Sequence, residues 1–360
     1  PVLLTFLPKQ GTDLSEPVDI AKKHLTLISL TRLPCRAMAE QLPPIRLDGD
    51  HVTLVFAVIG HNIDLVYLGP RLADQADLVM LVKAGQYGRH ENQPDVPLIT
   101  GLLPQVGAGY AGRPAFSFLQ DQRQIDPTFR LMEMTADGTK GVFVWTDHDV
   151  GMRVTQTWTV KAGDVVRVTT DLQADDDCSA ALTGATTAVL PFSGRYDRLT
   201  WFPGRWAREA EATDVPIGRQ ATVMQSSGGK SAFEGGNWLI ISDSQAGDCI
   251  GLHMSCLGDH FAQVQRDVNN RTIVSLGEAQ LFGAVQPVAD CSMNLGVVEF
   301  CYAADQDRLA QNFQTYIRQD VLPNRATWTL RKVHLNSWEV LGFDLSETAL
   351  IQLADDAADL

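Results

Sequence analysis

Three side chains near the end of the sequence, Asn336, Trp338 and Glu339, have types and spacing that suit sugar chemistry. They lie at the C-terminal end of a strand-like run, ATWTLRKVHLNSW, and precede a run with helical spacing, LSETALIQLADDAADL. The flat face of a tryptophan packs well on the apolar C–H face of a pyranose ring. Trp338 is therefore a candidate sugar contact. A tryptophan packed between two domains would occupy the same position, and sequence position alone does not separate the two interpretations.

Signatures of other chemistries are missing from the sequence. The eight histidines include no pair at the i, i+4 spacing of a helical zinc site, and none accompanies a cysteine motif. There is no G-x-S-x-G nucleophile motif and no phosphate-binding G-x-x-x-x-G-K-[ST] motif. We therefore predict no metal site and no cofactor. The glycine-rich run Ser226–Asn237 is predicted to be a loop between two strands, and His334 to be a structural histidine.

Charge and cysteine content restrict the class of protein. The 360-residue chain has a formal net charge of −14, and its acidic runs are expected to be solvated surfaces. Such a chain repels phosphate backbones, so nucleic acid is an unlikely partner, whereas a neutral soluble ligand is compatible. The six cysteines form no C-x-x-C motif and are expected to be buried thiols, with a Cys249–Cys256 disulfide as the less favoured alternative.

No apolar run reaches the length that a membrane span requires, about 18 residues. The longest apolar stretch near the start, Leu25–Leu30, is also too short for the core of a signal peptide. These observations predict a cytoplasmic protein without a membrane partner.

The middle of the chain has the pattern of a mainly β protein. Residues 1–44 show no sustained period and are predicted to be an irregular N-terminal extension. From Ile45 to Tyr302, short β-branched runs recur every 8–15 residues between Gly, Asp, Asn and Ser. MRVTQTWTV and VVRVTTDL alternate around KAGD, which predicts a hairpin with one buried face. Residues 45–302 are therefore predicted to form one large antiparallel β-sandwich.

The period changes to that of a helix after Tyr302. A linker helix is predicted over Asp305–Leu322 within a linker of residues 303–328, with Asp305 or Asp307 as its N-cap. Residues 329–360 are predicted to be a strand and a helix, the helix capped by Ser346 or Asp344. A lone β-α unit cannot bury both faces of its strand, so it is interpreted as the first unit of an incomplete (β/α)8 barrel.

The C-terminal sequence resembles the start of the catalytic barrel in bacterial α-galactosidases of the melibiase type, glycoside hydrolase family 36. Eight positions carry this resemblance: Arg331, Val333, Asn336, Trp338, Glu339, Phe343, Asp344 and Glu347. Upstream, DLVYLGPRL (Asp64–Leu72) and GRYDRLTWFPGRWAREAE (Gly194–Glu211) resemble two further motifs of the family. The matches follow the family's order from about Ile45 to Leu360, nearly the whole chain.

The resemblance implies a β-supersandwich joined by a helix to a (β/α)8 barrel that hydrolyses terminal α-linked galactose with retention. In the family, one aspartate is the nucleophile and a second is the acid and then the base. Both are expected after Leu360, so no catalytic residue is expected in this chain and the chain alone is expected to be inactive. Trp338 is the one substrate-binding residue that the resemblance transfers. An oligosaccharide substrate and a homo-oligomer, tetramer or dimer, are also implied.

Two departures from the family pattern concern its substrate range. Tyr110, in GAGYAGRPAF, stands where the family has an aspartate on a sandwich loop, and KSAFEGGNWLII (Lys230–Ile241) replaces a histidine-rich family motif. Two other functions remain open: a non-catalytic sandwich for oligomerisation or carbohydrate binding, and a galactosyl transferase on the same scaffold.

Overall fold

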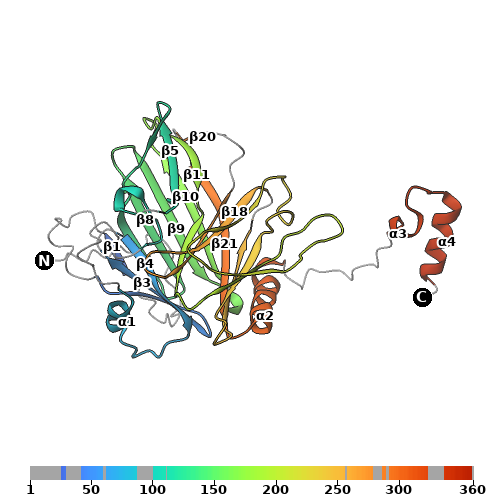
Figure 1. Ribbon diagram of the computed structural model, residues 1–360, viewed down its shortest axis with the longest axis horizontal. Helices are drawn as coiled ribbons and strands as arrows, with labels where there is room; N and C mark the ends of the chain where they lie inside the picture. The colour runs from blue at the N-terminus through green and yellow to red at the C-terminus, as the bar shows by residue number, and fades with distance from the viewer. Residues whose placement is uncertain are drawn as a thin grey trace, which may run out of the picture. The chain divides into compact units, whose positions relative to one another are not determined.

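The structure is a computed structural model, and it describes most of the chain in two compact units, Pro1–Tyr316 and Ile317–Leu360 (Figure 1). The described residues are 26–29, 42–59, 62–86, 100–110, 112–255, 258–278, 286–288, 292–322 and 336–358. All strand pairings among them are antiparallel. The predicted antiparallel sandwich is therefore confirmed.

One large sheet of ten strands forms one layer of the sandwich. Its spatial order is β1 (Thr26–Ser29), β7 (Arg130–Ala136), β8 (Lys140–Asp147), β9 (Met152–Val160), β10 (Val166–Ala174), β21 (Ser292–Ala303), β17 (Cys249–Met254), β16 (Trp238–Ser242), β13 (Arg198–Trp201) and β14 (Thr213–Pro216). β1 lies within the N-terminal segment for which the sequence predicted no regular structure. It pairs with β7 and so belongs to the sheet.

Three smaller sheets accompany the large one. The first is β2 (Ile45–Asp48), β3 (Val52–Ile59) and β4 (Asn62–Pro70). The second is β12 (Ala188–Phe192), β19 (Thr272–Glu278), β18 (His260–Arg266) and β15 (Thr222–Ser226). The third is β20 (Gln286–Pro287), β11 (Ala181–Ala185), β5 (Phe116–Gln120) and β6 (Arg123–Ile125).

Helices are few and short among the described residues. They are α1 (Leu78–Gly85), α2 (Gln306–Tyr316), α3 (Trp338–Leu341) and α4 (Glu347–Ala358), with the 3₁₀ turns η1 (Val106–Ala108) and η2 (Ala162–Asp164) and the π turn η3 (Ile317–Val321). No described helix combines the length and the apolar character needed to cross a membrane.

A chain of aromatic rings joins the sheets across the core. Phe56 of β3 packs on Phe143 of β8 and Trp158 of β9, each at a centroid distance of 5.1 Å. Trp158 then contacts Phe300 of β21 at 5.8 Å, and Phe300 contacts Phe192 of β12 at 6.2 Å. Three of the four contacts are edge-on, the geometry that aromatic quadrupoles favour, and the fourth is tilted. These rings fix the large sheet against two of its smaller neighbours.

The predicted hairpin is present as β9 and β10. Met152, Val154 and Trp158 are buried in the core, and Arg167 lies on the opposite, exposed face. Asp164 in the connecting turn is buried, and both of its carboxylate oxygens accept from the backbone N–H of His51 at 3.2 Å. The turn is therefore tied to the rest of the sandwich.

A helix is present where the sequence predicted one over Asp305–Leu322, although α2 itself ends at Tyr316, and Asp305 is its cap. The Asp305 carboxylate accepts from the backbone N–H of Arg308 at 2.7 Å. The helix packs close to the outer face of the large sheet because Gly251 has no Cβ; a Cβ there would lie 2.7 Å from the side chain of Leu309. The π turn η3 follows directly after Tyr316.

The C-terminal unit contains α3 and α4. The Ser346 hydroxyl accepts from the backbone N–H of Ala349 at 3.2 Å, so Ser346 is the cap of α4, one of the two residues predicted. The strand predicted before α3, and His334 within it, lie outside the described residues.

Candidate functional site

Trp338 opens helix α3 and is largely exposed. Its backbone N–H donates to the Asn336 side-chain oxygen at 3.1 Å, and its ring meets Phe343 edge-on at 4.9 Å. The indole is 52% exposed and Glu339 is exposed beside it. The sequence analysis placed Trp338 at the end of a strand, whereas the structure has it as the first residue of a helix, because Asn336 binds the free N–H that begins the turn.

Tyr110, the residue at the position of the family's aspartate, lies against the sandwich. Its hydroxyl interacts with the Gln265 side chain on β18, and burial together with nearby Asp267 raises the pKa of Tyr110. The ring fills the space beside Gly112, where a Cβ would lie 2.6 Å from it. The guanidinium of neighbouring Arg113 lies 3.8 Å above the centroid of the Phe261 ring. The loop is thus stacked on β18.

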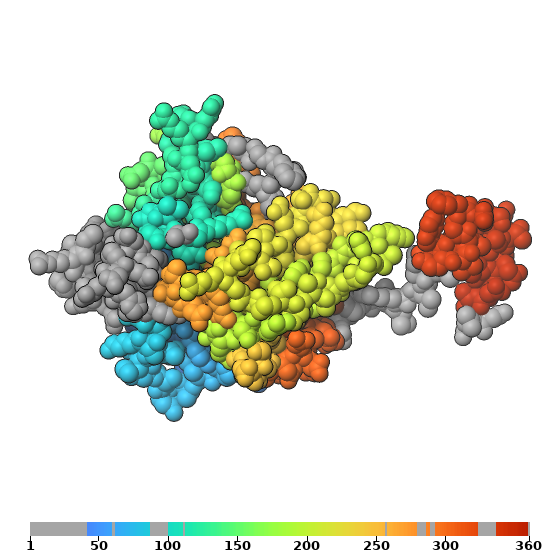
Figure 2. All heavy atoms as spheres, viewed as in Figure 1, coloured from blue at the N-terminus to red at the C-terminus, as the bar shows by residue number. Residues whose placement is uncertain are grey.

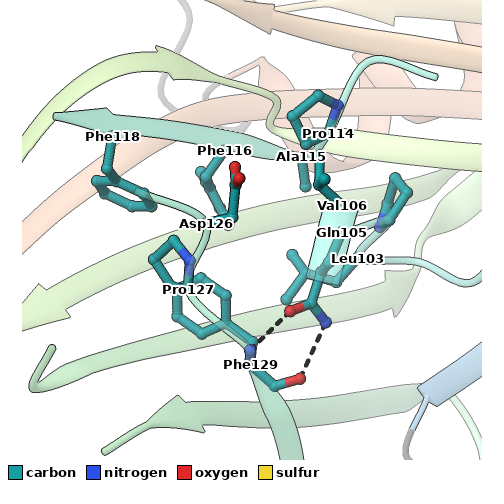
Figure 3. A pocket seen from close by; sticks show the side chains of 11 residues that line it. Leu103, Gln105, Val106, Pro114, Ala115, Phe116, Phe118, Asp126, Pro127 and Phe129 are labelled. Atoms are coloured by element: carbon teal, nitrogen blue, oxygen red, sulfur yellow. Dashed lines mark hydrogen bonds between the residues drawn. The ribbon is translucent and has the colours of Figure 1, made fainter. Parts of the chain in front are cut away.

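A hollow lies near the start of β7 (Figure 3). Phe116, Phe118 and Phe129 line it, with Gln105 at one side. Gln105 is fully engaged, however: its amide donates to the Phe129 carbonyl at 2.9 Å, and its oxygen accepts from the Phe129 N–H at 2.6 Å. Asp126 is the only ionisable side chain in its wall. Gln105 therefore holds the start of β7 in place, and the hollow presents no set of convergent polar groups.

A more pronounced constellation lies on the outer face of the large sheet, beside the C-terminal end of α2. Phe202 and Trp238 stack in parallel there, with centroids 3.5 Å apart and an interplanar angle of 8°. Trp238 is 39% exposed. An exposed, rigid aromatic pair of this kind is a common basis for ligand binding.

Two loops that adjoin the large sheet, here called excursions, bring this aromatic pair together: residues 202–211 and residues 226–237. Glycines allow the two excursions to approach closely. The excursion of residues 202–211 receives a hydrogen bond from the Glu234 N–H to the Gly204 carbonyl at 2.9 Å. Gly236 has a φ of +69°, and a Cβ there would lie 2.4 Å from the Phe202 carbonyl oxygen. The buried His260 ring holds the Gly236 carbonyl oxygen at 2.6 Å. Residues of both excursions lie on the face seen in Figure 2, in yellow-green and yellow.

A chain of polar side chains leads from the aromatic pair to α2. Asn237 contacts His253 Nε2 at 3.2 Å, and His253 Nδ1 lies 3.0 Å from Glu299 Oε2. The Tyr316 hydroxyl, at the end of α2, donates to Glu299 Oε1 at 2.5 Å. Burial alone would raise the pKa of Glu299, but the hydrogen bonds from His253 and Tyr316 lower it below its usual value. Glu299 is therefore an anion that joins the sheet to the helix.

These groups can bind and orient a ligand, and nothing beside them indicates an activated nucleophile. The described thiols are buried, and burial raises the pKa of Cys249 and of Cys301 to about 12, so they remain protonated. Within the described part of the chain, no three His, Cys, Asp or Glu residues lie close enough together to hold a metal ion. Cys249 is free, so the alternative Cys249–Cys256 disulfide is absent.

This constellation was not predicted from the sequence. Ser226–Asn237 was predicted to be a loop between two strands, which is confirmed by β15 and β16 at its ends. His253 and Glu299 come from different strands, 46 residues apart, and only the pairing of β17 with β21 brings them together. The one available signal was the Gly-Gly-Asn-Trp run before β16.

Comparison with known families identifies most of the sandwich. The family described as "Glycosyl hydrolase family 36 N-terminal domain" matches residues 61–286. An α-galactosidase of Escherichia coli is 25% identical over 179 residues, which are 48% of this chain and 25% of that protein. A probable α-galactosidase C of Aspergillus terreus is 29% identical over 190 residues, 50% of this chain and 25% of that protein.

Solved structures share the fold. The α-galactosidase AgaA of Geobacillus stearothermophilus superimposes with a TM-score of 0.74 at 17% identity, covering 88% of this chain and 48% of its own. An α-galactosidase of Lactobacillus brevis gives a TM-score of 0.73 at 19% identity, covering 88% and 47%. The chain therefore spans about half the length of these enzymes.

Proposed function

Because this chain belongs to glycosyl hydrolase family 36 through its N-terminal domain, we propose that it forms the N-terminal part of a retaining α-galactosidase. Such an enzyme removes terminal α-linked galactose from oligosaccharides. The match of the family's N-terminal domain to residues 61–286 carries this proposal. The curated relatives named α-galactosidase support it.

In this proposal the sandwich supports a catalytic domain and the chemistry takes place elsewhere. Retaining glycosidases need two carboxyl groups about 5–5.5 Å apart at the scissile bond. We assign neither to this chain, because it spans about half of the solved α-galactosidases that share its fold. Residues 329–360 would supply the first β-α unit of the (β/α)8 barrel, and the barrel segments that follow would supply both aspartates.

The first test is the activity of the 360-residue chain on an aryl α-galactoside. We expect no turnover, because both carboxylates are assigned to the barrel. Measurable hydrolysis by the purified chain would contradict that assignment. The matched experiment is to determine the coding sequence after the Leu360 codon and to assay its product. Retention of configuration at the released galactose is then expected, and a product without glycosidase activity would contradict the proposal.

Trp338 provides a residue-level test in such a longer protein. Its ring is exposed and is braced only by the edge of Phe343 within the described C-terminal residues. As a substrate contact, Trp338→Ala should raise KM for an aryl α-galactoside at least about tenfold, because stacking on the sugar is lost. Trp338→Phe should recover part of the loss. An unchanged KM in both variants would exclude the substrate role.

Association of copies of the protein is also proposed, as a dimer or tetramer. Sedimentation of the longer protein tests this directly. A clean monomer at working concentration would contradict it.

A further inference from the structure

We propose that Phe202 and Trp238, with the polar groups beside them, form a binding platform for a neutral pyranose ring on the sandwich. This inference needs only residues of the described sandwich, so it does not depend on the barrel or on catalysis. We call this set of residues, Phe202, Asn237, Trp238, His253 and Glu299, the platform.

The stacked pair of Phe202 and Trp238 is rigid before a ligand binds. Parallel stacking on Phe202 fixes the Trp238 ring, and Phe202 itself packs against the apolar cluster under α2. The close approach at Gly236 and the bond from His260 to its carbonyl fix the backbone that carries Trp238. A preorganised surface loses little conformational entropy on binding.

Polar side chains lie in a row that starts at Trp238 on the large sheet. His253 lies directly opposite Trp238 in the β16–β17 pairing, and Glu299 lies opposite His253 in the β17–β21 pairing. Arg167, exposed on β10, lies opposite Glu299. One row across the sheet therefore runs from an aromatic ring to a carboxylate and a guanidinium. His253 and Glu299 are already bonded to each other, to Asn237 and to Tyr316, so they fix the row, and the exposed guanidinium of Arg167 at its end is the group that can donate to a sugar hydroxyl.

Negative charge favours a neutral sugar over an anionic ligand of similar size. The chain carries a net charge of −14, and Glu299, two strands from Trp238 in the row, is held in its anionic form. These negative charges would repel an anionic ligand but not a neutral pyranose.

The experiment follows the indole N–H resonances of the ¹⁵N-labelled full chain during titration. The probes are methyl α-galactopyranoside and methyl α-glucopyranoside, and the Trp238→Phe spectrum assigns the Trp238 signal among the seven tryptophans. We expect the Trp238 resonance to shift and to saturate in the millimolar range, up to about 100 mM of either glycoside. A Trp238 resonance that stays fixed with both glycosides overturns the proposal, even where other indoles move.

Two variants make the result specific. Trp238→Ala should weaken binding at least about tenfold, because the stacking surface is gone. Trp206→Ala is the control: Trp206 is 69% exposed, lies on the same excursion as Phe202 but outside the platform, and its loss should leave the affinity within about twofold. Folded Trp238→Ala protein that binds as well as the wild type would overturn the proposal. If that variant does not fold, the wild-type indole titration alone decides.

Discussion

Two phenylalanines show how differently the two compact units treat apolar side chains. Phe56, in the sandwich, is 0% exposed and touches rings on two strands of the opposite sheet. Phe343, in the C-terminal unit, is 91% exposed and meets one ring, that of Trp338. Val340, Leu345 and Ile351 are also more than half exposed.

The difference shows which unit has a core of its own. The sandwich buries its large side chains among its own sheets, as an independent domain does. The described helices α3 and α4 bury none of theirs. Large exposed apolar patches usually mark sites that contact another protein surface, a membrane or a ligand. In the function proposed above, neighbouring β-α units of the barrel would cover this surface.

The largest expected contrast comes from truncating one aromatic ring in each unit. Phe56→Ala should lower the free energy of unfolding of the sandwich by about 3–5 kcal/mol, because it removes a fully buried ring. Phe343→Ala should change it by less than about 0.5 kcal/mol, because the ring is exposed. Chemical denaturation followed by tryptophan fluorescence measures both. Similar losses in the two variants would break the comparison.

A buried ion pair gives an effect of similar size with a pH signature. Arg271 donates to Asp64 at 2.5 Å, and its other nitrogen donates to the carbonyls of Leu65 and Pro191. Arg271→Met should cost about 3–5 kcal/mol at neutral pH, because a buried carboxylate is left without its partner. Arg266→Met, which removes a less buried guanidinium, is the matched control.

The sign of the pH dependence follows from Asp64. Burial outweighs the attraction of Arg271 and raises the pKa of Asp64 above its usual value. The native state therefore binds this proton more tightly than the unfolded state does, and removing Arg271 strengthens that preference. The loss in Arg271→Met should shrink as the pH falls from neutral towards the raised pKa of Asp64. A loss that is independent of pH would show that Asp64 is not the cause.

Weakening the attachment of α2 to the large sheet should lower the free energy of unfolding by a smaller amount. Tyr316→Phe removes a hydrogen bond to the anionic Glu299 and should cost about 1.5–3 kcal/mol. Because the pKa of Glu299 is lowered in the native state, its contribution is present above the unfolded value, near 4.5, and is lost as the pH falls below it. Glu299→Gln should remove this acid-dependent part of the unfolding curve. An identical acid limb in the wild type and in Glu299→Gln would refute this role.

The smallest expected effect compares two helix caps, each a side-chain oxygen that accepts from a backbone N–H three residues later. Asp305 caps α2 on the sandwich, and Ser346 caps α4 in the C-terminal unit. Asp305→Ala should lower the stability of the sandwich by about 1 kcal/mol. Ser346→Ala should reduce helical circular dichroism and leave the sandwich transition unchanged. Equal shifts of the sandwich transition in both variants would mean that the two units unfold together.

Local pattern was sufficient to predict much of the fold. Alternation around KAGD predicted the β9–β10 hairpin, and helical spacing with Asp305 predicted α2, because in both cases the signal lies within a few turns of chain. Strand β1 was missed because its partner, β7, lies about a hundred residues away and its own segment shows no alternation. The short helix α3 was missed because four residues are too few to show a period.

The platform could not be predicted from sequence, for a different reason. Trp238 lies in Lys230–Ile241 and Phe202 in Gly194–Glu211, two segments that the sequence singled out only for their comparison with family motifs. Their stacking depends on the close approach at Gly236, which is a contact between segments more than thirty residues apart. For Trp338, sequence suggested a sugar contact and the structure shows an exposed ring, so its role stays a prediction.

The position of β21 has a consequence for synthesis of the protein. This strand, Ser292–Ala303, is the last of the sandwich in the sequence, yet it lies between β10 and β17 and pairs with both. Until the ribosome has released it, the five strands from β1 to β10 and the four from β17 to β14 cannot join into one sheet. Each half then presents an unpaired inner edge, a template for association with other nascent chains. Chaperone dependence should therefore be greatest for chains arrested just before residue 292 and should fall sharply once residue 303 has emerged.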